Sequence, residues 1–266
     1  MGKAGGMQAR TERAPAKLTL SLRVTGVRQD GYHLLEAEMV SLDLADELTF
    51  SEGEGLEVVD PSGSAGRVPA GRDNLVSRAL AHVGRRAHVR LVKRIPAGGG
   101  LGGGSADAAA VLRWAGVGSG PSGPGPDTLR SVSRLGADVP FCLVGGRARV
   151  RGVGEVVEPL APRPKALVLV LPPFGVSTEA VYRAWDWLGG PTADGPNDLE
   201  PAALLVEPRL AAWRDALGEA TGKVPVLAGS GSSWFVEGTL GELGLEGRPC
   251  LNVEGEEGRL VAVRTG

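Results

Sequence analysis

Residues 96–106 form a glycine-rich segment with the sequence Pro-Ala-Gly-Gly-Gly-Leu-Gly-Gly-Gly-Ser-Ala. It lies between residues 88–95, whose apolar pattern predicts a β-strand, and residues 107–114, which predict an α-helix. Glycine permits positive φ angles and lets a ligand approach the backbone closely. The start of a helix adds unpaired N–H groups and the positive end of the helix dipole. We therefore expect this loop to bind phosphate through Pro96, Ala97, Gly98, Gly99, Gly100, Leu101, Gly102, Gly103, Gly104, Ser105 and Ala106.

Other glycine loops that bind nucleotides require residues that this loop does not have. A Walker A loop has a lysine before its Ser or Thr, whereas only glycines precede Ser105. Gly98, Gly100 and Gly103 match the Gly-x-Gly-x-x-Gly pattern of dinucleotide sites. Those sites also need an acidic residue at the end of a second strand, but residues 116–127 are rich in Gly, Pro and Ser and indicate a loop. A purely structural turn is the other alternative, because the chain contains 42 glycines.

The composition indicates a globular protein that acts on small molecules. The chain has 266 residues, of which 42% are hydrophobic and 23% charged, and its formal net charge is −2. The sequence has no basic stripe or polybasic run, which argues against nucleic-acid and membrane-surface partners. Cys142 and Cys250 lack the spacing of metal or redox pairs, so we expect two reduced, mostly buried thiols. A disulfide between them is the alternative.

The N-terminal residues 1–13 are polar and contain no apolar segment of the kind found in signal peptides. The sequence also has no run of 18 apolar residues, as a membrane-spanning helix would require. These features predict a soluble, cytoplasmic protein. We expect residues 1–13 to fray, with Met7 as an alternative start of translation.

The pattern of apolar residues predicts a β-rich beginning, followed by mixed helices and strands. Alternation over residues 17–24 predicts a strand with Leu18 and Leu22 inside and Lys17 and Thr19 outside. Further expected elements are two strands within 34–50, a helix at 74–83, a helix at 128–135 capped by Asp127, strands within 141–157, strands at 166–171, 224–227 and 234–236, and helices at 178–188 and 204–217. This mixture on both sides of residue 160 predicts an α+β protein with two lobes.

Several short motifs give the glycine loop a more specific meaning. In chain order they are Pro15-Ala16-Lys17, Asp30-Gly31-Tyr32-His33, the loop itself, Gly136-Ala137-Asp138-Val139-Pro140-Phe141 and the turn Gly229-Ser230-Gly231. With these motifs the chain resembles the GHMP kinase superfamily from about residue 14 to residue 236. Within the superfamily it resembles the branch of the non-mevalonate isoprenoid route, because mevalonate and homoserine kinases differ at the Asp-Gly-Tyr-His element.

The resemblance implies the two-lobed GHMP kinase fold, with the active site between the lobes. Residues 1–158 would form an N-terminal ATP-binding domain, and residues 159–266 a C-terminal GHMP kinase domain. It also implies that three positions depart from the usual family pattern. Thr19 replaces an Asn, Ala106 replaces a second Ser, and Ala228 replaces a Ser. None of these changes removes a group with an expected catalytic role.

The resemblance implies a reaction in which the γ-phosphoryl group of ATP moves to the 2-hydroxyl of a cytidylyl-methylerythritol, releasing ADP. Asp138 would be the catalytic base and Lys17 its cationic partner. Outside such motifs, an isolated Asp is usually a turn or cap residue and an isolated Lys is solvated. Asn74 resembles an adenine-contacting residue, with a helix cap as the alternative. Mg²⁺ would enter as MgATP, because the sequence shows no acidic cluster for a metal site of its own.

The resemblance also assigns contacts to the cytosine of the substrate. Tyr32 and His33 correspond to residues that hold the base by stacking and by hydrogen bonding to its edge. Tyr182 corresponds to a second aromatic residue against the cytosine, with Trp185 and Phe174 as alternatives. Three rival functions are a GHMP kinase for another alcohol, a catalytically silent nucleotide-binding protein and a dinucleotide-dependent oxidoreductase. The sequence does not predict an oligomeric state.

Overall fold

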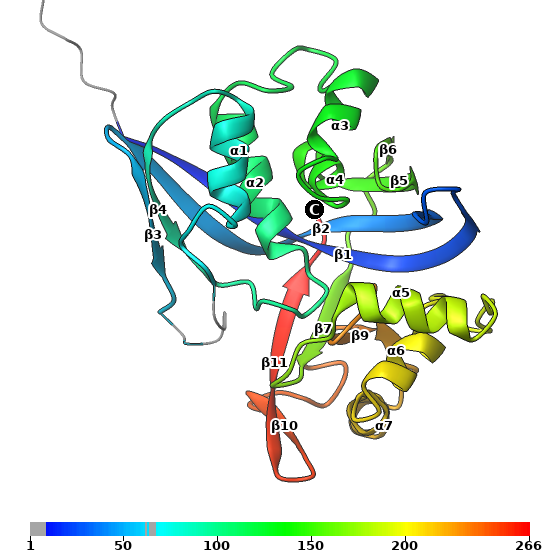
Figure 1. The fold of residues 1–266 in the computed structure, drawn as a ribbon. Coiled ribbons are helices and arrows are strands. Elements are labelled where there is room, and N and C mark those ends of the chain that lie inside the picture. Colours follow the sequence, from blue (N-terminus) through cyan, green and yellow to red (C-terminus); the bar gives the residue numbers. More distant parts are fainter. Residues whose placement is uncertain (1–8, 62, 64–67) are drawn as a thin grey trace, which may run out of the picture.

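The computed structural model places the helices and strands in two groups, one before and one after residue 161 (Figure 1). It describes residues 9–61, 63 and 68–266, so the two proposed start residues, Met1 and Met7, lie outside the described part. The first group is β1 (Arg10–Val27), β2 (His33–Ser51), β3 (Gly55–Val59), α1 (Leu75–His82), β4 (His88–Val92), α2 (Gly103–Trp114), α3 (Pro126–Val132), α4 (Val139–Val144), β5 (Arg147–Gly152) and β6 (Val156–Leu160). The second group is β7 (Ala166–Leu171), α5 (Thr178–Trp187), α6 (Glu200–Val206), α7 (Leu210–Thr221), β8 (Val226–Leu227), β9 (Trp234–Glu237), β10 (Cys250–Val253) and β11 (Glu256–Arg264).

The long strand β1 is the element that brings the two lobes and the site together. It pairs antiparallel with β2, and the register shifts at three places along it. Each such bulge bends the strand and increases its twist. Residues 16–19 are all buried, because β1 is covered on both faces. Lys17 and Thr19, which the alternating pattern places on the outside, therefore lie inside the protein.

The first sheet has the strand order β3-β4-β2-β5-β6, with β1 paired to β2. Helix α2 packs against β1 and contacts both α1 and α4. Its residues 106–112 are all buried, and four of them are alanines. Small side chains allow this helix to lie close to the sheet and to its neighbouring helices. The sheet thereby fixes the start of α2 beside β1.

The second sheet has the order β10-β11-β7-β9-β8, with β7 at its centre. Residues 167–171 of β7 are all buried, as expected for a central apolar strand. Helices α5, α6 and α7 form a consecutive packed series, and α7 also contacts β9 and β10. Figure 1 shows helices α5, α6 and α7 on the opposite side of β1 and β2 from helices α1–α4.

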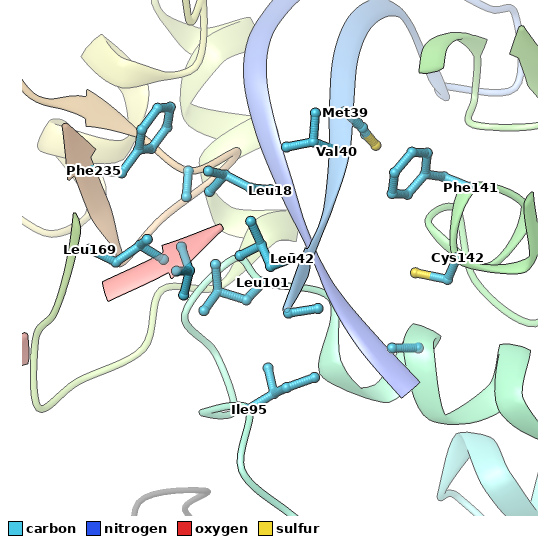
Figure 2. Close-up of a cluster of buried hydrophobic side chains, with 14 of the residues drawn as sticks. Leu18, Met39, Val40, Leu42, Ile95, Leu101, Phe141, Cys142, Leu169 and Phe235 are labelled. Atoms are coloured by element: carbon cyan, nitrogen blue, oxygen red, sulfur yellow. The ribbon is translucent and has the colours of Figure 1, made fainter. Parts of the chain in front are cut away.

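One continuous hydrophobic core joins the two groups. Figure 2 shows Leu18 and Leu42 of the paired long strands in the middle of this core. Phe141 of α4 lies on one side of these strands, and Leu169 and Phe235 of the second sheet lie on the other. The strand pair is thus part of the core of both lobes.

Several sequence-based expectations about individual elements are wrong. Residues 34–50 belong to the single strand β2, because the segment around residues 43–46 continues the ladder with β1. The segment expected to contain strands at 141–157 begins with helix α4, whose second residue is a proline. Asp127 lies in the first turn of α3 after the N-cap Gly125. The helix expected at 204–217 is divided into α6 and α7, and residues 10–13 are part of β1.

The predicted domain division between residues 158 and 159 falls inside β6, which pairs with β5 of the first sheet. The chain passes from the first sheet to the second through residues 161–165. The division into two domains stays a prediction. In the described part of the chain, no helix has both the length and the apolar character of a membrane span.

Candidate active site

The glycine loop leads directly into a helix with free backbone amides. Helix α2 begins at Gly103, before the expected residue 107, and its N-cap is Gly102 with a φ of 67°. Gly98 and Gly100 each have a φ of 75°, a conformation that other residues rarely adopt. The first helical hydrogen bond runs from the amide of Ala106 to the carbonyl of Gly102. The amides of the preceding residues therefore have no helical acceptor, which makes this end of α2 suitable for an anion.

The first half of the loop, residues 98–100, packs against the second lobe. A Cβ atom on Gly98 would lie 3.2 Å from the Cα of Gly175. A Cβ atom on Gly100 would lie 2.3 Å from the carbonyl oxygen of Ala228, which is well inside contact distance. These glycines are thus required by the close approach of two backbone segments. Phosphate binding by Gly98 and Gly100 stays a prediction, and both residues line the pocket described below.

The second half of the loop, residues 102–104, lies beside two lysines. A Cβ atom on Gly102 would lie 2.7 Å from Cγ of Lys17. A Cβ atom on Gly103 would lie 3.2 Å from the Nζ atom of Lys93. Lys17 is paired with Asp138, and Lys93 with Asp46 and Asp107, so the positive potential here comes from the start of the helix. This half of the loop has the features of a phosphate cradle.

Lys17 and Asp138 form an ion pair at the edge of this cradle. The Nζ atom of Lys17 lies 3.4 Å from Oδ2 of Asp138 and 3.2 Å from the hydroxyl of Thr19. Its backbone amide donates to the carbonyl of Leu101 in the glycine loop. The Lys17 side chain is 7% exposed and that of Asp138 is 31% exposed, so the carboxylate is the accessible partner. A buried ammonium thus lies next to a carboxylate that is open to the pocket.

These groups face a pocket of about 500 Å³ between the two lobes. Most of the residues expected at the site line it, namely Lys17, Asn74, Pro96, Ala97, Gly98, Gly100, Leu101, Gly102, Gly103, Gly104, Ser105, Asp138 and Tyr182. Gly99 and Ala106 are instead buried behind the loop, where Gly99 lies against Ser233. The second lobe contributes Thr178, Leu199, Gly229 and Ser230 to the pocket wall.

Asn74 is the N-cap residue of α1. Its Oδ1 atom accepts a hydrogen bond from the amide of Val76 at 2.8 Å. Its Nδ2 atom donates to the carbonyl of Pro69 at 2.7 Å. The helix-cap alternative is therefore confirmed, and it coexists with a position in the pocket wall. Contact of Asn74 with adenine stays a prediction.

An aromatic cluster joins the β1–β2 hairpin to α5. The ring of His33 lies 4.6 Å from that of Tyr182 and 5.5 Å from that of Trp185, measured between centroids. The Nε2 atom of His33 lies 2.8 Å from Oδ1 of Asp186, a partner that sequence reasoning missed. Burial and the nearby charge of Asp138 raise the pKa of Tyr182 to about 12, so this phenol is neutral at physiological pH.

Two of the expected aromatic candidates lie apart from this cluster. Tyr32 is 63% exposed, and the guanidinium of Arg28 lies 5.9 Å from its ring centroid. The ring of Phe174 is covered by the guanidinium of Arg209 at 4.0 Å. Of the three candidates for the second aromatic contact, Tyr182 is the one that lines the pocket. The structure thus brings His33 and Tyr182 together and leaves Tyr32 at the surface.

A buried triad of charged residues lies beneath the cradle, and sequence reasoning missed it. Lys93 forms ion pairs with Asp46 and, at 2.8 Å, with Asp107. Asp46 also accepts hydrogen bonds from the amides of Arg94 and Ile95. Burial raises the pKa of Asp107 to about 7 although Lys93 opposes this shift. The only sequence signal is an aspartate within an alanine-rich helix, which does not reveal its partners.

The Oδ1 atom of Asp107 is buried and has no hydrogen-bond partner among the residues that the structure describes. Burial disfavours the charged form of Lys93, but its two carboxylate neighbours outweigh this effect and raise its pKa. Both Lys93 and Asp107 line the pocket. The triad therefore connects the interior of the first lobe to the floor of the candidate nucleotide site.

The two cysteines and the acidic side chains in the described part of the chain are of the types that ligate metal ions. Cys142 is buried and Cys250 half-buried, and both are free thiols, as expected. Burial raises the pKa of the Cys142 thiol, which keeps it protonated. Within residues 9–61, 63 and 68–266, the structure contains no cluster of three or more His, Cys, Asp or Glu side chains suited to a metal ion.

The fold and the pocket define a small-molecule kinase of the GHMP class. The sequence matches the GHMP kinases N terminal domain over residues 74–146, which include the glycine loop and Asp138. The crystal structure of L. major mevalonate kinase in complex with R-mevalonate is similar in fold, with a TM-score of 0.64 at 13% identity. That similarity covers 100% of this chain and 98% of the other.

Closer relatives specify the branch. A protein from Paracoccus denitrificans named 4-diphosphocytidyl-2-C-methyl-D-erythritol kinase is 40% identical over 246 residues, covering 85% of this chain and 86% of the relative. A crystal structure of 4-(cytidine 5'-diphospho)-2C-methyl-D-erythritol kinase has a TM-score of 0.71 and 33% identity, covering 97% of this chain and 99% of the other. The chain belongs to the 4-diphosphocytidyl-2-C-methyl-D-erythritol kinase family. The family resemblance and the α+β GHMP kinase fold expected from the sequence are confirmed.

Proposed function

We propose that the protein transfers the γ-phosphoryl group of ATP to the 2-hydroxyl of 4-diphosphocytidyl-2-C-methyl-D-erythritol. Its relatives are named as kinases of this compound, and the reaction would be a step of the non-mevalonate route to isoprenoid precursors. The hydroxyl oxygen forms a bond to the γ-phosphorus, the bond from that phosphorus to the β,γ-bridging oxygen breaks, and ADP leaves. The hydroxyl proton is taken up by the protein. A cytoplasmic location stays a prediction from the sequence.

The Lys17–Asp138 pair is the observation that carries this proposal. A carboxylate that is partly exposed to the pocket can accept the proton of a substrate hydroxyl. The adjacent ammonium, 3.4 Å away, can offset charge that develops on the transferred group. Both residues lie where the glycine loop meets the second lobe. We therefore assign Asp138 as the base and Lys17 as the catalytic cation.

The second half of the glycine loop is the proposed site of the ATP phosphates. Free amides at the start of α2 provide positive potential there. The magnesium ion enters with ATP as part of the substrate and prefers oxygen ligands. The hydroxyl of Ser105 lines the pocket and is our candidate for contact with it.

The acceptor is proposed to bind on the side of the pocket formed by the hairpin and α5. His33 and Tyr182 would hold the cytosine, since their rings are 4.6 Å apart and Tyr182 lines the pocket. Tyr32 would join them only after the hairpin tip moves, because its ring is now 63% exposed. Its role is therefore the weakest of the three assignments.

Two alternatives remain tied to specific features. A GHMP kinase for another alcohol would share the loop and the Lys17–Asp138 pair but would not depend on the aromatic cluster. A catalytically silent nucleotide-binding protein would have no need for the ion pair beside the cradle. The ion pair and Tyr182 of the aromatic cluster line one pocket, which favours the kinase with a cytidylyl substrate.

Release of ADP in a coupled assay tests the proposal directly. The cytidylyl compound, methylerythritol without the nucleotide, mevalonate and homoserine are compared as acceptors at equal concentrations. We expect phosphorylation of the cytidylyl compound to be the most efficient by kcat/KM. If methylerythritol alone were phosphorylated as efficiently, the cytosine site would be wrong, and if no acceptor released ADP, the assignment as a kinase would fail.

A further inference from the structure

Asn197 is a buried polar residue that the proposed reaction does not use. It is 1% exposed and lies between α5 and α6 of the second lobe. The segment around it is hydrogen-bonded to β1, the strand that carries Lys17. The amide of Leu22 donates to the carbonyl of Pro196 at 2.8 Å, and the amide of Asp198 donates to the carbonyl of Leu22 at 3.0 Å. Asn197 is thus fixed by its backbone to the strand of the catalytic lysine.

The side chain of Asn197 holds a turn of the second lobe. Its Nδ2 atom donates to the carbonyl oxygens of Leu227 at 3.0 Å and Gly229 at 2.7 Å. Its Oδ1 atom accepts from the amide of Leu199 at 3.0 Å. Carbonyl oxygens only accept hydrogen bonds, so these partners define which end of the side chain is the nitrogen. A carboxylate in its place would face two acceptors with no proton to donate.

The turn that Asn197 holds, residues 227–230, forms a wall around the amino group of Lys17. Gly229 has a φ of 62°, and a Cβ atom there would lie 3.6 Å from the Nζ atom of Lys17. It would also lie 3.7 Å from the hydroxyl of Thr19, to which Lys17 donates a hydrogen bond. The next residue, Ser230, is hydrogen-bonded to Thr178 of α5 at 2.8 Å. A shift of this turn would therefore act on the catalytic lysine, and also on the glycine loop, because Ala228 packs against Gly100.

We propose that Asn197 is a positioning residue for phosphoryl transfer, which it serves by holding the 227–230 turn against Lys17. This inference rests on the proposed function, in which Lys17 is the catalytic cation. The two hydrogen bonds from one amide fix the turn, the turn limits the position of the ammonium, and the ammonium is then kept beside Asp138. Catalytic groups displaced by about 1 Å can lose on the order of 100-fold in rate, so a distant residue can matter this much.

The test is Asn197→Asp, a change that preserves size and removes both donated hydrogen bonds. We expect kcat to fall by about tenfold or more, while the KM for ATP changes by less than about threefold. Thr265→Val is the matched control, because Thr265 is also buried and its hydroxyl bridges Arg163 and Lys165 away from the pocket. The control should lower the melting temperature and leave kcat unchanged. If Asn197→Asp lowered only the melting temperature, Asn197 would be merely structural and the inference would be wrong.

A double-mutant cycle with Lys17→Met tests whether Asn197 acts through the lysine. We expect Asn197→Asp to change kcat by less than about twofold in the Lys17→Met background, because its target is already absent. Independent, multiplicative losses would overturn the inference. If Asn197→Asp does not fold, Asn197→Ser, which keeps a single hydrogen-bond donor, replaces it in these measurements. Failure of the proposed function is seen separately, as absence of ADP release by the unmodified chain.

Discussion

The two halves of the glycine loop contain the same residue type for different physical reasons. At Gly98 and Gly100, glycine is needed because the backbone of the second lobe occupies the space of a side chain. At Gly102 and Gly103, the loop passes over Lys17 and Lys93 and then opens as a helix start. A glycine-rich sequence therefore does not by itself reveal a binding surface. Here one half joins the lobes, and the other half forms the candidate phosphate site.

Gly100→Ala should break the first half of the loop. Its φ of 75° disfavours a side chain, and the new Cβ atom would lie 2.3 Å from the carbonyl oxygen of Ala228. We expect the free energy of unfolding to fall by about 3 kcal/mol, as backbone strain and overpacking add. Urea denaturation measures this change. A variant as stable as the unmodified protein would show that the lobes are not packed together at this point.

The buried triad beneath the second half should make stability depend on pH. Burial raises the pKa of folded Asp107 to about 7, above its ordinary value of 3.8. Between these values the folded protein retains a proton that the unfolded chain has lost, so stability falls as pH rises through this window. One proton contributes at most about 1.4 kcal/mol per pH unit.

Asp107→Asn removes this titration and provides the comparison. We expect its free energy of unfolding to decline less steeply between pH 4 and pH 7 than that of the unmodified protein, whose window follows from the pKa of Asp107. Lys93 stays charged in both states over this range, because its pKa is raised. Urea denaturation at several pH values measures the two slopes. Equal slopes would contradict a protonated Asp107 in the folded state.

Gly104→Ala, in the second half of the loop, should weaken ATP binding without lowering stability, whereas Gly100→Ala should lower stability. Gly104 is exposed in the first turn of α2, and a Cβ atom there makes an ordinary contact of 3.4 Å with Leu75. Stability should be unchanged or higher, since alanine favours helix. ATP affinity should fall by about tenfold, since the new methyl group obstructs charge-assisted hydrogen bonds to phosphate. Calorimetric titration with ATP measures this loss. Unchanged affinity would show that the phosphates of ATP do not bind at this half of the loop.

Gly103→Val would be less informative than Gly104→Ala. A side chain at Gly103 would lie 3.1 Å from Ile95 and 3.2 Å from the amino group of Lys93. Loss of ATP binding could then arise from poor packing as well as from obstruction of the phosphates.

A smaller difference is expected between the KM effects of His33 and Tyr32, the neighbouring residues assigned to the cytosine of the substrate. His33 is held by Asp186 and Tyr182, whereas Tyr32 is 63% exposed. His33→Ala should raise the KM for the cytidylyl substrate by about fivefold, which corresponds to one hydrogen bond, with little change for ATP. Tyr32→Ala should have a smaller effect if its ring stays at the surface. A larger effect for Tyr32 in steady-state kinetics would show that the hairpin tip closes over the base.

The parts of the site that could be predicted from sequence are those carried by contiguous motifs. The glycine loop, Lys17 and Asp138 each lie in a short pattern, and the structure brings all three to one pocket. Lys93, Asp107 and Asn197 were missed because their partners come from distant segments, and isolated polar residues give no signal of burial. The alternation in β1 misplaced Lys17 because a strand covered on both faces has no outside. Strand β2 was divided in two because a local Asp-rich segment resembles a turn although its ladder continues.

Asp138→Asn is the direct test of whether the Lys17–Asp138 pair carries out phosphoryl transfer. The amide keeps the size of the side chain and cannot accept the substrate proton as a carboxylate does. Asp127→Asn is the control, because the Asp127 side chain is 99% exposed on α3. We predict that Asp138→Asn lowers kcat with ATP and the cytidylyl substrate by on the order of 100-fold or more, with ATP affinity preserved in calorimetry. A kcat within about threefold of the Asp127→Asn control would show that Asp138 is not the base for phosphoryl transfer.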